Sequence, residues 1–139
     1  MKRRDFELRT ERLGPLPLVN HYLVGLLPLF DRFVPTSHGH TRLDYAIGLG
    51  VLLRSIRTER EPLYRLGEVV HTFAPEGFGL SEAEAGRVAD DTIGRALDRL
   101  FDADRGSLLT GIVLAAVEHF DLSLDELHND STTVKLAGQ

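Results

Sequence analysis

The stretch "DDTIGRALDRLFDADRGSLLTGIVLAAVEHF", residues 90–120, predicts two consecutive helices. Its first half repeats apolar side chains at the spacing of one helix face: Ile93, Ala96, Leu97, Leu100 and Phe101. Asp90 or Asp91 is the expected cap of this helix, and Asp104 that of the next, because carboxylate oxygens accept from the free N–H groups of a first turn. The second helix has an apolar stripe of its own: Leu109, Ile112, Val113, Ala116, Val117 and Phe120. Two helices joined this tightly favour a fold of helix packed on helix.

The rest of the chain extends this pattern. We expect helices over 15–35, with a break at Pro28, over 41–57 and over 62–73. Gly48 and Gly50 indicate a close helix–helix contact, and Ser81 with Glu84 has the spacing of a capping box.

The two ends of the chain read differently. The carboxyl-terminal stretch "LHNDSTTVKLAGQ", residues 127–139, is rich in hydroxyl and β-branched side chains and predicts a strand. Residues 6–14, "FELRTERLG", are compatible with a short amino-terminal strand or an arm. The predicted fold class is therefore all-α: a compact bundle of six to eight short helices with a carboxyl-terminal β-strand.

Length and composition exclude several classes of protein. A chain of 139 residues makes one domain with a real core. It has no cysteine, which excludes disulfides and thiolate metal sites. Its longest apolar run, "YAIGLGVLL" at 45–53, is far shorter than the ~20 residues of a membrane span. We expect a soluble, cytoplasmic protein that does not act in a membrane.

Charge is distributed unevenly between the two halves. The net charge is −5, yet residues 1–65 hold 11 Lys+Arg against 7 Asp+Glu, whereas residues 66–139 hold 5 against 14. A net of +4 in the first half favours an anionic partner there. The alternative is ordinary variation of surface charge along a chain.

Two sets of arginines are candidate phosphate contacts. The first straddles the turn after residue 57 and comprises Arg54, Arg57, Arg60 and Arg65. Such a cluster can hold phosphates without reading base sequence. The alternative is local neutralisation by Glu59, Glu61 and Glu68.

The second set is Arg95 and Arg99, one helical turn apart and opposite the apolar stripe of their helix. Residues 80–100 loosely resemble a helix-turn-helix, with 91–101 as the helix that would enter a DNA groove. Asp98 and Asp102 stand beside the arginines and would repel phosphate. An ordinary helical hairpin is the alternative interpretation.

Catalytic motifs are absent from the sequence. There is no phosphate-binding loop, dinucleotide fingerprint, zinc-protease or nucleophile-elbow pattern. His38 and His40 fit a solvated loop better than a metal site, which needs three or four ligands. Asp130 lies on the predicted strand, but one carboxylate cannot hold two metal ions.

Four phrases, in order, carry a family resemblance: "ERLGPLPLVNHYLVGLLPLFDRFVPT", "REPLYRLGEVV", "DDTIGRALDRLFDAD" and "LHNDSTTVKLAGQ". Over roughly residues 8–139 the chain resembles the amino-terminal region of bacterial insertion-sequence transposases of the DDE class. The resemblance implies that an RNase H-like catalytic domain follows the helical region. Asp130 would then be the first acid of the Asp-Asp-Glu triad and a ligand of Mg²⁺ or Mn²⁺ in a full-length parent.

The same resemblance divides the chain into a helical domain, residues 1–126, and the start of a missing catalytic domain, residues 127–139. Because the chain ends nine residues after Asp130, its triad is incomplete, and we expect no cofactor and no stand-alone enzyme activity. The expected function is a DNA-binding and assembly domain that binds transposon terminal inverted repeats and forms homo-oligomers. The alternative is a transposase-derived protein-interaction module that dimerises without binding DNA.

Overall fold

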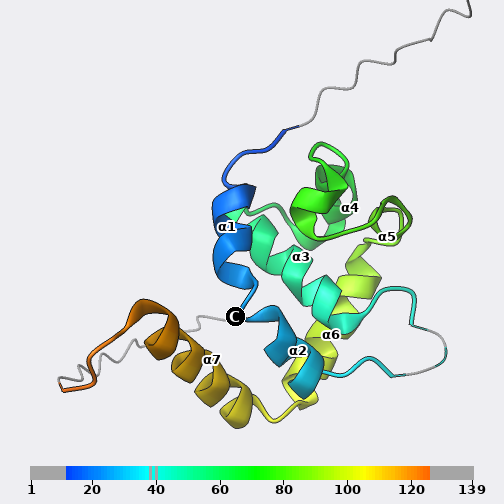
Figure 1. The fold of residues 1–139 in the computed structure, drawn as a ribbon. Coiled ribbons are helices and arrows are strands. Elements are labelled where there is room, and N and C mark those ends of the chain that lie inside the picture. The colour runs from blue at the N-terminus through cyan, green and yellow to red at the C-terminus, as the bar shows by residue number, and fades with distance from the viewer. Residues whose placement is uncertain (1–11, 38, 40, 126–139) are drawn as a thin grey trace, which may run out of the picture.

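The computed structural model describes residues 12–37, 39 and 41–125. This part of the chain folds into α-helices joined by short loops and 3-10 turns (Figure 1), which confirms the all-α prediction. The elements in chain order are α1 (Leu16–Leu23), α2 (Leu27–Phe33), α3 (Tyr45–Thr58), η1 (Leu63–Arg65), α4 (Leu66–Val70), η2 (Pro75–Phe78), α5 (Glu82–Ala85), α6 (Asp90–Asp102) and α7 (Arg105–Phe120).

Helix α3 is the centre of the fold and packs against α1, α2 and α6. The two glycines of α3 explain how closely its neighbours approach. A Cβ added at Gly48 would lie 3.4 Å from the Cβ of Ala96 on α6, and one at Gly50 would lie 3.1 Å from Leu27 Cδ2 on α2. The close helix contact predicted at these glycines is confirmed.

Two apolar clusters share α3 and α6. The first lies among α1, α3, α4, η2 and α6, where Leu16, Val51 and Phe78 are fully buried. The second lies among α2, α3, α6 and α7 and includes Phe30, Leu49 and Leu108. The cleft described below lies where α6 meets the segment that leads into α3.

Helix boundaries differ from the predicted ones where backbone geometry intervenes. The break in residues 15–35 comes before Pro28, which occupies the first turn of α2, where its missing N–H costs nothing. The helix predicted from residue 41 begins only at Tyr45, whose backbone N–H donates to Thr36 Oγ1. The helix predicted over 62–73 is a 3-10 turn followed by the five-residue α4.

The caps of α5 and α7 are as predicted, and the cap of α6 is not. Glu84 N donates to Ser81 Oγ and Ser81 N to Glu84 Oε2, completing the capping box of α5. Asp104 Oδ1 accepts from Ser107 N at 3.1 Å. The prediction of Asp90 or Asp91 as a cap is wrong, because α6 begins after Ala89, whose N–H donates to Thr92 Oγ1 at 2.9 Å.

The predicted stripe of α7 is only partly covered by the core: Ile112 packs against it, whereas Leu109, Val113 and Phe120 are exposed. Leu108 is the buried residue of α7, whereas Leu109 is 62% exposed and Val113 is 50% exposed. Both sides of this helix are apolar, so the spacing of its apolar residues could not identify the covered side. On α6, Ile93 and Ala96 are buried as predicted, but Phe101 is exposed.

Both predicted strands fall largely on residues that the structure does not describe. Of the amino-terminal stretch, Arg12 forms an isolated parallel bridge with Phe73, and its N–H donates to Thr72 O at 3.0 Å. The strand and domain start predicted at 127–139, with Asp130, lie outside the described residues. Among the helices that are described, none has the length and apolar character needed to cross a membrane.

Candidate functional site

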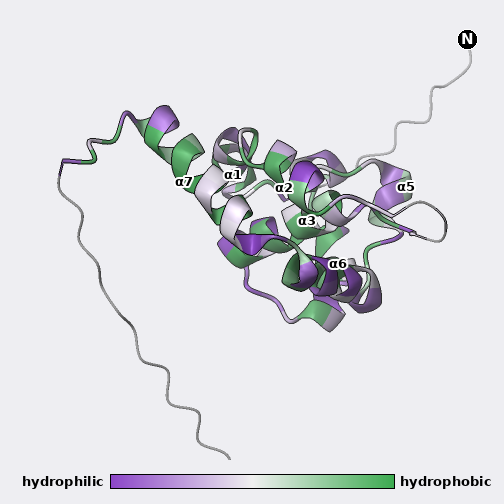
Figure 2. Ribbon diagram, turned by 90° about the horizontal axis from the view of Figure 1, so that it is seen from below, coloured by the Kyte–Doolittle hydropathy of each residue, from purple (hydrophilic) through white to green (hydrophobic). Residues whose placement is uncertain are grey.

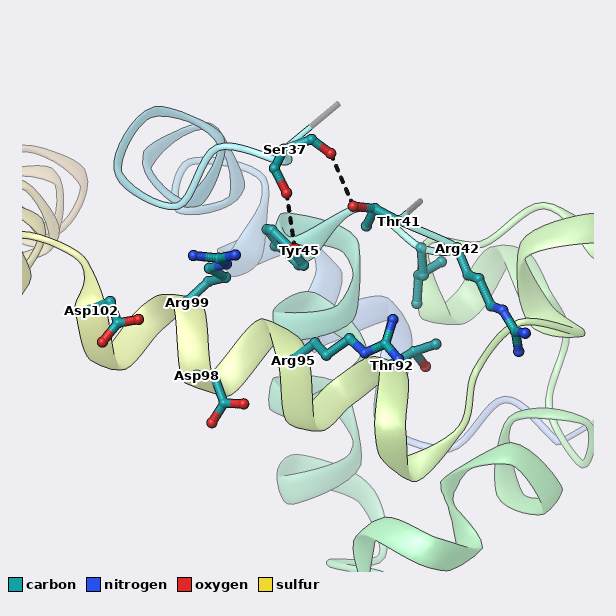
Figure 3. A pocket seen from close by; sticks show the side chains of 10 residues that line it. Ser37, Thr41, Arg42, Tyr45, Thr92, Arg95, Asp98, Arg99 and Asp102 are labelled. Carbon is teal, nitrogen blue, oxygen red and sulfur yellow. Dashed lines mark hydrogen bonds between the residues drawn. The ribbon is translucent and has the colours of Figure 1, made fainter. Parts of the chain in front are cut away.

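A polar cleft of about 540 Å³ lies between α6 and the segment that enters α3 (Figure 3). One wall comes from Ser37 and from the residues between Thr41 and Tyr45, and the other from the outward side of α6. Its lining residues are Ser37, Thr41, Arg42, Leu43, Tyr45, Thr92, Arg95, Asp98, Arg99 and Asp102. Three arginines and several hydroxyl groups therefore line one cleft.

The hydroxyl wall is held in place by hydrogen bonds. Tyr45 is buried at the start of α3, and its Oη lies 3.2 Å from Ser37 Oγ. Thr41 Oγ1 donates to the carbonyl oxygen of Ser37 at 3.0 Å. The hydrogen bond with Ser37 lowers the pKa of Tyr45 from its ordinary value, and Thr41 and the cationic Arg99 lower it further. The electrostatics of this wall thus favour negative charge.

The arginine wall is exposed to solvent. Arg99 extends toward Tyr45 and Ser37, while Asp98 points to the other side of α6 (Figure 3). Arg95 Nη2 lies 3.8 Å from Asp91 Oδ2, a loose ion pair one turn away in which both side chains are more than half exposed. A pair this open contributes little and leaves the Arg95 guanidinium free to bind another anion.

Arg54, from the first predicted set, is buried and only 5% exposed. Its Nε donates to Asn20 Oδ1 at 2.6 Å, and Asn20 Nδ2 donates to Gly77 O at 2.8 Å. Burial lowers the pKa of the Arg54 guanidinium. Arg54 therefore links α3 to α1 and η2 and lies away from the surface that a phosphate could reach.

Arg57, Arg60 and Arg65 are exposed on another part of the molecule from the cleft. Arg65 pairs with Glu61 at 3.1 Å and with Glu68 at 3.6 Å, as the alternative of local neutralisation predicted. Glu59 pairs instead with Arg12. The structure thus brings Arg95 and Arg99 together with a third arginine and leaves the first set dispersed.

The candidate metal ligands are mostly beyond the described residues. Asp130, His38 and His40 all fall there. Across 12–37, 39 and 41–125, no group of three or more His, Asp or Glu side chains is placed to hold a metal ion. Asp90 and Asp91 are exposed in the first turn of α6, where acids interact well with the helix dipole.

Residues 8–114 match the family described as a domain of unknown function, DUF4277. The chain belongs to this family. The match ends within α7, so it covers the whole cleft and excludes the carboxyl-terminal tail. No curated protein and no solved structure matches the chain. Since the family description assigns no activity, the resemblance to DDE transposases stays a prediction.

Sequence reasoning missed half of the cleft. Arg42, Ser37, Thr41 and Tyr45 stand in or just after a loop and form no recognised short motif. They reach α6 only because α3 packs tightly on it through Gly48. The sequence predicts a close contact at Gly48, but one sequence does not identify the helix that meets it.

Proposed function

We propose that this chain is the DNA-contacting and assembly domain from the amino-terminal end of a DDE-type transposase. The cleft formed by Arg42, Arg95 and Arg99 would hold the DNA backbone. The resemblance of the sequence to that transposase region supports the class of protein. The presence of three arginines in the lining of one hydroxyl-bearing cleft is the observation that supports phosphate contact.

The chemistry of the cleft suits a phosphate group. A guanidinium donates two parallel hydrogen bonds to phosphate oxygens, and such charge-assisted bonds are stronger than neutral ones. Hydroxyl groups such as those of Ser37 and Thr41 add neutral donors, as they commonly do on the DNA backbone. Because Arg95 and Arg99 are one turn apart on α6, they can follow successive phosphates of one strand.

The local charge limits how much DNA this cleft can hold. Asp98 and Asp102 also line it, so three cations stand against two anions. Figure 3 shows Asp98 on the other side of α6 from Tyr45, which leaves the hydroxyl wall beside Arg99 the more favourable place for an anion. The arrangement supports contact with a few phosphates rather than a broad basic surface.

The chemistry of strand transfer is not assigned to the described residues. Two-metal catalysis needs several converging carboxylates. The part of the chain that the structure describes offers no such group, and Asp130 lies outside it. We derive no metal-dependent step, and the proposed role is to bind and position DNA.

The proposal is tested by fluorescence anisotropy with a labelled duplex DNA at ~50 mM salt, where phosphate contacts are strong. The double variant Arg95→Ala/Arg99→Ala should lose most of the affinity. The matched control is Arg57→Ala/Arg60→Ala, which removes the same charge from exposed positions away from the cleft. Equal loss in both variants, or no binding by the wild-type chain, would contradict the proposal.

The alternative function, a protein-interaction module without DNA binding, is favoured by a separate observation. Helix α7 exposes Leu109, Val113 and Phe120 to solvent. Exposed apolar surface of this kind commonly marks an interaction site. If DNA does not bind but the chain self-associates, this alternative replaces the first.

A further inference from the structure

Helix α7 has two apolar sides, and the rest of the chain covers one of them. On the covered side, Leu108 and Ile112 join the cluster that includes Leu29 and Phe33 of α2. The fit is close, because a Cβ added at Gly111 would lie 3.2 Å from Leu29 Cδ2. Helix α7 lies at the edge of the molecule (Figure 1), so its other side faces outward.

The outward side has the spacing of a helix–helix seam. Gly106, Leu109, Val113, Ala116 and Phe120 follow one another at steps of three and four residues, the a/d pattern of paired helices. Leu109 is 62% exposed and Phe120 is 53% exposed. Residues 106–117 carry no charged side chain, and the green of apolar residues recurs along α7 in Figure 2. A helix that is apolar on two sides rarely leaves the second side exposed to water.

We propose that this seam pairs with the same seam of a second copy of the chain, antiparallel and about a two-fold axis at Val113. Because the axis passes through Val113, residue i of one copy lies level with residue 226 − i of the other. Val113 then faces its own counterpart, and Leu109 lies level with Val117, which borders the seam beside Ala116. Phe120, the largest residue of the seam, faces Gly106, the smallest. The ring of Phe120 can then occupy the space that Gly106 leaves open.

The charges at the ends of α7 favour this orientation. Arg105 opens the helix and Asp121 ends it. Each stands at the unfavourable end of its own helix dipole, which prefers anions at its start and cations at its end. The antiparallel register places Arg105 of one copy opposite Asp121 of the other. A parallel pair would instead set Arg105 beside Arg105 and Phe120 beside Phe120.

The ring of Phe120 is already ordered for such a contact. It stacks on Tyr22 of α1 with ring centroids 5.6 Å apart and planes 30° apart. His119 packs edge-on against Tyr22 at 5.8 Å. A side chain fixed before association loses less conformational entropy on binding. The far end of the seam is therefore preorganised by α1.

The decisive test uses the absence of cysteine from the chain. Val113→Cys introduces a single thiol that, on the two-fold axis, meets its counterpart and forms a disulfide under mild oxidation. The control is Leu114→Cys, which at 61% exposure is more accessible than Val113 at 50% but lies about 100° around the helix. We expect a covalent dimer from Val113→Cys and little from Leu114→Cys. Equal cross-linking of both variants would overturn the proposed register.

A second measurement needs no cross-link. Sedimentation of the wild-type chain should show a dimer, which Leu109→Asp should dissociate and Leu114→Asp should not. Arg105→Asp should weaken the dimer, and adding Asp121→Arg to that variant should restore it. A wild-type monomer at high micromolar concentration would mean that another part of this chain or a different protein covers the seam, and would overturn the proposal.

This inference does not rest on DNA binding. The variant Arg95→Ala/Arg99→Ala should sediment as a dimer like the wild type, because the cleft and the seam lie on different helices. Conversely, a Leu109→Asp monomer that still binds the labelled duplex would separate the two properties. Loss of DNA binding and loss of the dimer can therefore be told apart, and each result contradicts only one of the two proposals.

Discussion

Helices α6 and α7 follow each other along the chain but differ in what their exposed sides present to solvent. Helix α6 buries one side, with Ile93 and Ala96 fully covered, and presents Arg95 and Arg99 to solvent. Helix α7 is apolar on both sides, and Leu108 is its buried residue. The buried apolar residues of α6 pack within the chain, and its polar residues form one wall of the cleft. The outward apolar side of α7 is the surface that we propose for a second copy of the chain.

The largest expected effect contrasts one buried residue on α6 with one exposed residue on α7. Ile93→Ala should lower the free energy of unfolding by about 2–5 kcal/mol, because it leaves a cavity between α6 and α3. Leu109→Ala should change the stability of the monomer little, since Leu109 is 62% exposed. Denaturant unfolding at low protein concentration measures both. Similar losses would show that the outward side of α7 is packed within the monomer.

Glycines of the two helices provide a smaller contrast. Gly94 on α6 has open space where a Cβ would be, so Gly94→Ala should stabilise the fold by about 0.5–1 kcal/mol through helix propensity. Gly111→Ala on α7 should gain less or destabilise, because its Cβ would meet Leu29 Cδ2 at 3.2 Å. Thermal unfolding of the two variants decides the comparison. A larger gain from Gly111→Ala would contradict the close packing of α2 on α7.

The smallest expected effect is on pH dependence, because a carboxylate, Asp104, caps α7 and none caps α6. Hydrogen bonds from the hydroxyl and N–H of Ser107 lower the pKa of Asp104. Its stabilisation is complete above the ordinary pKa of Asp, about 3.9, and is lost as pH falls through the lower folded-state value. At the start of α6, the N–H of Ala89 donates instead to the hydroxyl of Thr92, a group that does not titrate.

Amide hydrogen exchange across the acid range measures this difference. Protection in the first turn of α7 should fall at low pH before that of α6. Asp104→Asn keeps a capping oxygen without a charge, so its first turn should show a flatter pH profile. The same acid response in the wild type and Asp104→Asn would exclude Asp104 as its source.

Sequence alone predicted the local features well. The capping box at Ser81, the cap at Asp104 and the tight contact at Gly48 are set by neighbours a few residues away or by the absence of a side chain, and all are present. The buried side of α6 was also predicted, because one side of that helix is clearly polar.

One error is local, the cap of α6. The others concern properties that depend on the partner of a residue. The spacing of Arg54 and Arg57 could not show that Arg54 faces Asn20, buried in the fold. The pattern of α7 could not show which apolar side meets α2. Arg42 lines the same cleft as Arg95 and Arg99 because α3 packs on α6, which the sequence alone could not show. The strand predicted at 127–139 falls outside the described residues and stays a prediction.

The salt dependence of DNA affinity tests the central claim, that the arginines of α6 contact phosphates. Each phosphate contact contributes about −0.9 to the slope of log affinity against log salt. We predict that Arg95→Ala/Arg99→Ala makes this slope shallower by about 2, whereas Arg57→Ala/Arg60→Ala leaves it unchanged. An unchanged slope in the α6 variant, or the larger change in the Arg57/Arg60 variant, would contradict the account.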